Sequence, residues 1–190
     1  MKKPSRRRSL AAFSALSTLG LMPLASQAAD YTYIEGGFIQ RHDYGETGAG
    51  GRVAGSFDLP TIPLAIIGEF DGTNGLNQFD AGVVFHMPIV RQLSFFAGGT
   101  LEHADRNGKG YDDSSTGPGG RVGLRWQANQ VLELSPELRL VHLYHDDQVS
   151  VRLNALLNIA PHLDVQGAVQ GGDEQRYEVG LRYSFGSNRL

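Results

Sequence analysis

The chain has 190 residues, with 17 Lys and Arg against 20 Asp and Glu, 25 Gly and no Cys. The absence of Cys excludes disulfides, thiolate metal sites and a lipid anchor attached through Cys. The acidic balance disfavours nucleic acid or anionic lipid as an electrostatic partner.

Residues 1–28 have the parts of a secretory signal peptide. Five basic residues precede an apolar run that ends at Leu24, and small residues follow. The small-x-small spacing predicts export by the general route, with cleavage after Ala28. A membrane anchor is the alternative, but Gly20 and Pro23 interrupt a run that is already shorter than the ~20 residues a spanning helix needs.

Residues 29–190 are predicted to form one domain with a net charge of about −8, from 12 basic and 20 acidic residues. Its longest mostly apolar stretches are about ten residues, too short for a spanning helix. Apolar and polar residues instead alternate with period 2, which predicts β-strands separated by turns. Ten strands are expected, with eight as the alternative, at 31–41, 49–59, 64–72, 78–87, 93–103, 119–127, 131–144, 149–159, 163–171 and 176–185. Pro136 falls inside one of them and cannot donate to a ladder, so a bulge is expected there.

The connections between these strands alternate in length. Tight turns are expected at 60–63, 88–92, 128–130 and 160–162, and longer polar connections at 42–48, 72–77, 103–118, 144–148 and 170–175. Short periplasmic turns opposite longer outside loops are typical of outer-membrane barrels, with both chain ends in the periplasm. The pattern favours an up-and-down transmembrane β-barrel over the soluble sandwich or lipocalin-like barrel that alternation alone would also fit.

Aromatic residues on the apolar faces gather near the two ends of the predicted strands, with aliphatic residues and Gly between them. Such sorting is expected of a lipid-facing band with an aromatic rim at each membrane interface, and a soluble core gives no reason for it. The rim near the short turns contains Phe57, Phe85, Phe95, Trp126, Tyr183 and Phe185. The other rim contains Phe38, Phe70, Phe79, Tyr144 and Tyr177.

The opposite face of the same strands is rich in charged residues, which a dry soluble core could not accommodate. In a narrow membrane barrel these residues can pair across the lumen. Nearly all the basic ones are Arg, whose planar group bonds carboxylates through two N–H donors. The predicted lumen charge network contains Glu35, Arg52, Asp58, Glu69, Asp80, Arg121, Arg125, Glu133, Arg139, Arg152, Asp164, Glu178 and Arg182.

Two segments, Tyr31–Phe38 and Gly171–Phe185, carry a family resemblance. Together they resemble the small outer-membrane barrel family of gammaproteobacteria that was once proposed to supply secreted activators of a plant immune receptor. The resemblance implies an outer-membrane barrel without assigned chemistry, and the signalling role is not carried over. One departure is the tail at 186–190, since barrels of this type commonly end on the aromatic residue of the last strand.

The predicted connections offer little for catalysis. A His–Asp pair can activate water or a hydroxyl group, but no Gly-x-Ser-x-Gly turn surrounds the serines. The residues weighed are His103, Asp105, Ser114, Ser115, His142, His145, Asp146 and Asp147. No catalytic residue is predicted, and the protein is not expected to be an enzyme. A lipid- or peptide-cleaving enzyme of the outer membrane is the least favoured alternative.

Paired carboxylates at 112–113, 146–147 and 173–174 lie in the outward connections, where cations could bridge them to lipopolysaccharide phosphates. None follows the spaced calcium-loop pattern, so no metal site and no cofactor are predicted. The expected partners are outer-membrane lipid, lipopolysaccharide and, during biogenesis, the barrel-assembly machinery. Nucleic acid is not expected, and the chain is expected to be a monomer.

The expected function is a non-enzymatic outer-membrane barrel with a charge-plugged lumen, serving membrane integrity or surface interaction. A small narrow pore is the alternative. Ten strands enclose a lumen only slightly wider than that of eight-stranded barrels, which side chains fill, and open aqueous channels belong to barrels of ~16–18 strands.

Overall fold

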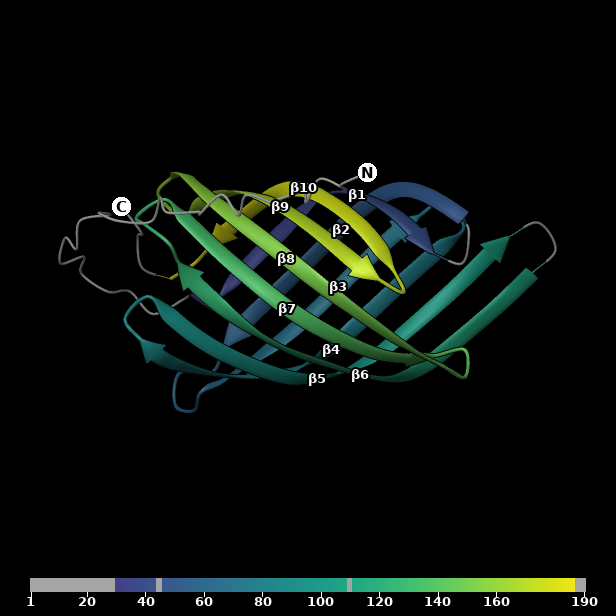
Figure 1. The fold of residues 1–190 in the computed structure, drawn as a ribbon, viewed down its shortest axis with the longest axis horizontal. Coiled ribbons are helices and arrows are strands. Elements are labelled where there is room, and N and C mark those ends of the chain that lie inside the picture. The colour runs from purple at the N-terminus through teal and green to yellow at the C-terminus, as the bar shows by residue number, and fades with distance from the viewer. Residues whose placement is uncertain (1–29, 44–45, 109–110, 187–190) are drawn as a thin grey trace, which may run out of the picture.

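The computed structural model describes residues 30–43, 46–108 and 111–186, which form one closed barrel of ten antiparallel strands (Figure 1). The all-β prediction and the strand number of ten are confirmed, and the alternative of eight is wrong. None of the described residues forms a helix long and apolar enough to cross a membrane. The strands are β1 (Tyr33–Asp43), β2 (Glu46–Asp58), β3 (Leu64–Thr73), β4 (Leu76–Val90), β5 (Leu93–Gly108), β6 (Tyr111–Gln127), β7 (Leu132–Leu143), β8 (Asp146–Ala160), β9 (Leu163–Gly172) and β10 (Gln175–Ser184).

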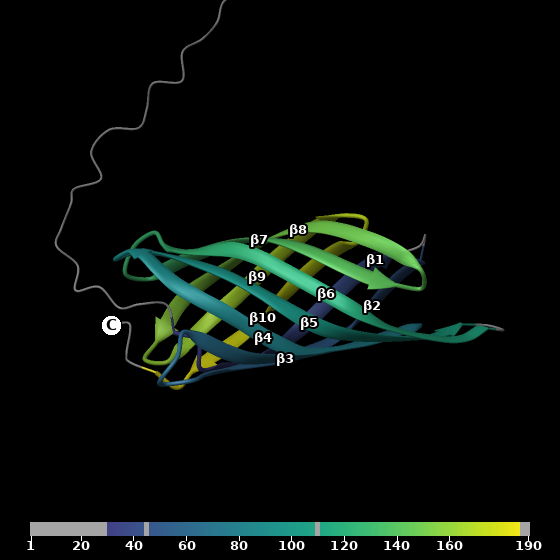
Figure 2. The same cartoon turned by 90° about the horizontal axis from the view of Figure 1, so that it is seen from below.

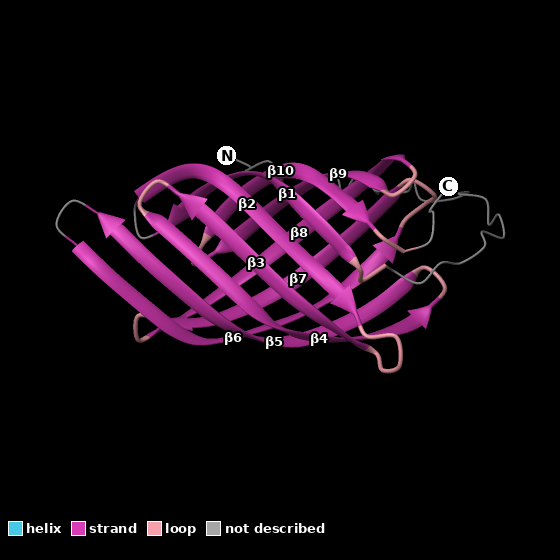
Figure 3. Ribbon diagram, turned by 180° about the vertical axis from the view of Figure 1, so that it is seen from behind, coloured by secondary structure: helices cyan, strands magenta, loops and turns pink. Residues whose placement is uncertain are grey.

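Each strand pairs with the strand before it, and the barrel closes between β1 and β10. Because the strand number is even, β1 starts and β10 finishes at the same end of the barrel, here called the termini end. The opposite end, where β1 turns into β2, is called the hairpin end. In Figure 3, which views the barrel from behind, every described element is a strand or a loop.

Side chains alternate between the two faces of each strand, with polar residues mainly inside the barrel and apolar residues mainly outside, the reverse of the arrangement in soluble proteins. Along β9, for example, Asp164 and Gln166 are buried inside the barrel, whereas Val169 is half exposed on its outer surface. The β-branched and aromatic residues that favour strands therefore lie mainly outside, and the polar residues lie inside. The interior is a polar lumen with one small apolar cluster, formed by Tyr31, Ala65, Ile67, Val84 and Phe96.

The predicted long connection at 103–118 is wrong. β5 and β6 instead continue as a paired hairpin, with His103 opposite Thr116 and Asp105 opposite Ser114. This hairpin projects furthest at the hairpin end of the barrel (Figure 2). Tyr144 supports it, because its hydroxyl group donates to carbonyl oxygens on both strands, at 3.0 Å on β5 and 3.2 Å on β6.

The bulge predicted at Pro136 is also wrong. The β6–β7 pairing is interrupted beside this residue but keeps its register, with Gly123 opposite Glu137 and Trp126 opposite Leu134. The hydroxyl group of Ser135 donates to the Leu124 carbonyl oxygen at 3.0 Å, so a side chain replaces part of the missing backbone ladder.

Candidate functional site

The residues predicted to form the lumen charge network lie inside the barrel, with one of them at its mouth. Arg121 and Glu178 have side chains only 11% and 4% exposed. Asp58 sits at the termini end, where its carboxylate lies 2.8 Å from His86 Nε2 and its side chain is 38% exposed. The other ten, each at most 6% exposed, are Glu35, Arg52, Glu69, Asp80, Arg125, Glu133, Arg139, Arg152, Asp164 and Arg182.

Six further charged residues lie in the lumen and were not predicted from the sequence. Glu137 is half-buried on the same face of β7 as Arg139, and the five fully buried ones are Arg41, Asp71, Glu102, Glu174 and Arg176. These five lie toward the hairpin end, where the predicted strands stop or turn polar. The signal for most of them was present, because Arg41 keeps the period-2 spacing from Glu35, and Asp71 keeps it from Glu69. Continuing the alternation beyond the aromatic rim would have placed them inside.

Glu69 on β3 is the point at which ion pairs cross the lumen. Its carboxylate accepts from Arg52 of β2 at 2.8 Å and lies 3.2 Å from Arg176 Nη2 of β10. Arg139 of β7 and Arg152 of β8 come within 3.9 Å of the same carboxylate. In the strand order of the barrel β8 lies directly opposite β3, so side chains from facing walls meet at Glu69.

Neighbouring ion pairs extend this crossing into a continuous layer. Arg139 Nη2 donates to Asp80 and to Glu102, each at 3.2 Å. Arg176 pairs with Asp71 and lies 3.1 Å from Glu178, which accepts from Arg152 at 2.6 Å. We call this layer the central belt. Its members are Arg52, Glu69, Asp71, Asp80, Glu102, Arg139, Arg152, Arg176 and Glu178.

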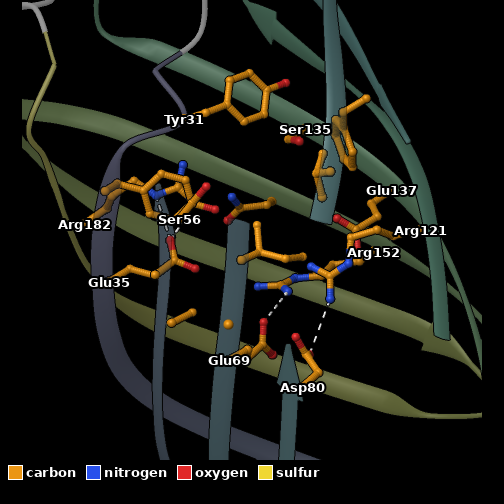
Figure 4. A pocket seen from close by; sticks show the side chains of 18 of the residues that line it. Tyr31, Glu35, Ser56, Glu69, Asp80, Arg121, Ser135, Glu137, Arg152 and Arg182 are labelled. Carbon is orange, nitrogen blue, oxygen red and sulfur yellow. Dashed lines mark hydrogen bonds and ion pairs between the residues drawn. The ribbon is translucent and has the colours of Figure 1, made fainter. Parts of the chain in front are cut away.

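A cavity of about 80 Å³ lies on the termini side of the central belt. In Figure 4, Tyr31 stands at one end of this cavity, and Glu69 and Asp80 stand at the other. We call it the vestibule. A water molecule needs roughly 10–15 Å³ of such volume, so the vestibule has room for several.

Tyr31 lines the vestibule at its termini end, and we call residues Asp30–Thr32 the N-terminal strap. Tyr31 is 6% exposed and stacks on His86, with ring centroids 3.9 Å apart and ring planes 14° apart. The Arg125 guanidinium lies 4.6 Å from the same ring centroid and donates to the Asp30 carbonyl oxygen at 2.7 Å. Burial raises the pKa of the Tyr31 hydroxyl above its ordinary value, so the strap residue in the lumen is uncharged at neutral pH.

The outer face of the barrel carries the predicted aromatic rims. Nine of the eleven rim residues are at least 38% exposed, namely Phe38, Phe57, Phe70, Phe79, Phe85, Trp126, Tyr177, Tyr183 and Phe185. Phe95 is half-buried on the outer face. Tyr144 lies in the turn between β7 and β8, not on the wall, with the Arg106 guanidinium 3.9 Å from its ring centroid. So much exposed apolar surface is unusual for a soluble monomer.

The residues weighed for catalysis make separate contacts. His142 Nδ1 lies 2.7 Å from Asp147, and His103 Nδ1 lies 2.8 Å from Thr116, both on the exposed surface. The hydroxyl group of Ser115 accepts from the Tyr144 amide at 2.8 Å. In the described part of the chain, these bonds do not join a serine, a histidine and an acid in one relay. The described residues also contain no group of three His, Asp or Glu side chains placed to hold a metal ion.

No family model and no curated protein sequence matches the chain. Among solved structures, the KdgM porin is similar, with 12% identity, a TM-score of 0.50 and coverage of 81% of this chain and 99% of that chain. A structure of the KdgM porin in complex with disordered oligogalacturonate gives the same values. The NanC porin is similar with 9% identity, a TM-score of 0.52 and coverage of 81% of this chain and 100% of that chain. At these identities the likeness shows a shared antiparallel β-barrel fold.

Proposed function

We propose that this chain is a non-enzymatic outer-membrane barrel whose lumen is closed by the central belt, and that it serves membrane integrity or surface interaction. The observation that carries the proposal is the inverse placement of its side chains. Charged residues are buried inside, as at Glu69, and large apolar residues such as Val83 and Leu153 are 49% and 44% exposed outside. Lipid would cover this outer surface, whereas water would not stabilise it.

Strand lengths support a membrane-spanning position. A transmembrane β-strand needs ~9–11 residues, and the shortest strands here, β3, β9 and β10, have 10 residues each. The closed ladder leaves no sheet edge around the barrel wall, as a strand structure in hydrocarbon requires. We assign the termini end to the periplasm and the hairpin end to the outside, since the hairpin end carries the projecting β5–β6 hairpin.

The closed lumen is tested by electrical recording. Refolded wild-type protein in a planar lipid bilayer should show no steady conductance steps, because ion pairs from facing walls meet at Glu69. Large, stable channels from the wild-type protein would contradict the closed lumen.

A narrow pore is the second candidate, and the vestibule is the observation that favours it. The cavity of about 80 Å³ shows that part of the lumen is not filled by side chains. The likeness to porins fits this candidate at the level of fold. An extended acidic sugar such as the oligogalacturonate in the KdgM complex would need a continuous path, and here the central belt crosses that path.

Export with removal of residues 1–28 is part of the proposal. Mass spectrometry of protein recovered from the outer membrane should give a chain that begins at Ala29 or one residue later. An exported species that retains Met1 and the basic residues after it would refute the predicted cleavage.

We further propose that the partners are outer-membrane lipid and lipopolysaccharide, with the barrel-assembly machinery acting during biogenesis, and that the barrel works as a monomer. The acidic residues near the hairpin end, such as Asp147 and Asp173, would then meet lipopolysaccharide phosphates through bridging cations. Chelation of divalent cations should weaken such contact, as measured by release of lipopolysaccharide from the purified barrel.

A further inference from the structure

We propose that the N-terminal strap is a stopper, with Tyr31 closing the termini end of a water-filled vestibule that the central belt closes on its other side. The barrel would then be a half-channel shut at two levels. This inference rests on the proposed closure of the lumen by the central belt, and it adds a second, separable closure made by the chain's own N-terminal segment.

The walls of the vestibule are polar and incompletely bonded, which is why it should hold water. Among its lining residues, the hydroxyl oxygen of Ser56, the amide oxygen of Asn154 and the Nε of Arg121 are buried without a hydrogen-bond partner among the residues that the structure describes. These groups include both donors and acceptors. Water can satisfy both kinds at once, and a dry cavity with such walls would be costly.

The strap is anchored through its backbone and its short polar side chains, which leaves the Tyr31 ring to point inward. The Asp30 carboxylate accepts from the Gly186 amide at 2.8 Å, and the Thr32 carbonyl accepts from the Phe185 amide at 2.9 Å. The Thr32 hydroxyl accepts from the Asp58 amide at 3.1 Å. None of these three anchors involves the side chain of Tyr31, so that ring can be removed without removing them.

The Tyr31 ring packs at the mouth against one wall of the lumen, formed by four neighbouring strands. It stacks on His86 of β4, lies beneath Arg125 of β6 and joins the apolar cluster that includes Val84 and Phe96. The ring is therefore held by contacts from β3, β4, β5 and β6 together, while the rest of the strap is held by β2, by Arg125 of β6 and by the segment that follows β10. Removing the ring should open a passage from the termini end into the vestibule.

Two positions on β8 can report on the two closures separately. Asn154 lines the vestibule, whereas Ser150 is buried in the lumen on the other side of Arg152, a member of the central belt. Both face inward, because each lies two residues from the inward-facing Arg152 on the same strand. The chain has no Cys, so a single introduced thiol gives a clean signal.

The experiment measures the reaction rate of each thiol with a small trimethylammonium methanethiosulfonate, using refolded barrels in lipid. In the Asn154→Cys protein, adding Tyr31→Gly should raise the rate at least about tenfold, because reaction no longer waits for a local opening. Adding Tyr31→Phe should leave the rate unchanged, since the stacked ring is kept. In the Ser150→Cys protein, Tyr31→Gly should change nothing. Retained mobility shift on boiling checks that each variant is folded.

The outcomes distinguish the stopper from the closed lumen. Equal rates at Asn154→Cys with Tyr31 and with Tyr31→Gly would overturn the stopper and leave the closed lumen intact. Rapid reaction of Ser150→Cys whenever Tyr31→Gly opens the mouth would overturn closure by the central belt. Acceleration by Tyr31→Phe as well as by Tyr31→Gly would show that the phenol group, and not the ring, makes the seal, which also contradicts the proposal.

Discussion

At the scale of single residues, the lumen depends on arginine. Arg52 uses two nitrogens to reach two carboxylates, with Nη1 2.7 Å from Glu35 and Nη2 2.8 Å from Glu69. A lysine ammonium is a point donor that cannot present this planar fork. After residue 28 the sequence has only one lysine, Lys109, which lies outside the described residues. The basic partner in each ion pair of the central belt is therefore an arginine.

Removing the Glu69 carboxylate should lower the free energy of unfolding. Glu69→Gln leaves Arg52 and Arg176 buried with one partner fewer, and breaking a buried ion pair from one side costs about 3–5 kcal/mol. The measurement is urea unfolding of the protein folded into lipid vesicles. The matched control is Asp147→Asn, whose side chain is 88% exposed and pairs only on the surface, so it should cost less than about 1 kcal/mol. Equal losses for both variants would contradict the role given to Glu69.

Which residues face the lumen could be predicted from the sequence, but which of them meet could not. Period-2 alternation is a local property, and it places Glu69 and Arg152 on the inward face without further information. Their approach to 3.9 Å depends on closure of the barrel, which leaves four strands between β3 and β8 on either side and so places the two strands opposite each other. Tyr31 shares the inward parity of Glu35 in the strand expected at 31–41, but its stacking on His86 of β4 could not be predicted, because that contact also depends on the closed barrel.

At the scale of strands, the two predictions that proved wrong concern segments that hydrogen bonds to neighbouring strands hold in place. Polar residues such as Ser114 and Ser115 led to the prediction of a loop. They extend β6 instead, because β5 pairs with them and the Tyr144 hydroxyl group hydrogen-bonds to both strands. Pro136 read as a bulge, yet Ser135 restores a hydrogen bond beside it. In both cases a hydrogen bond from a side chain to a neighbouring strand supplied what the backbone pattern alone did not predict.

The outward face of β4 gives a prediction about strand position in lipid. Val83 is 49% exposed in the middle of the apolar band, so Val83→Arg should cost about 2–4 kcal/mol when arginine loses water at mid-depth. Ser114→Arg on the projecting part of β6 should cost almost nothing. Folding titrations of the two variants into lipid vesicles measure the difference. Equal stability of the two would show that Val83 does not face lipid.

At the scale of the whole molecule, the barrel combines a lipid-compatible outer surface with two closures of its lumen. The ladder from β1 to β10 joins the two ends of the chain, and Glu35 opposite Arg182 places an ion pair on that seam, with Arg182 Nε 2.7 Å from the Glu35 carboxylate. Arg52 contacts both Glu35 and Glu69, so it joins this seam ion pair to the central belt. Loss of the pairing between β1 and β10 should therefore open the barrel wall and the lumen together.

The most direct test of the account is fractionation of cells that express the full chain, followed by gel electrophoresis with and without boiling. The protein should be recovered in the outer-membrane fraction and should shift in mobility on boiling, because a closed ladder of ten strands resists detergent until it is heated. Recovery as a soluble periplasmic protein with the same mobility before and after boiling would contradict a lipid-embedded barrel.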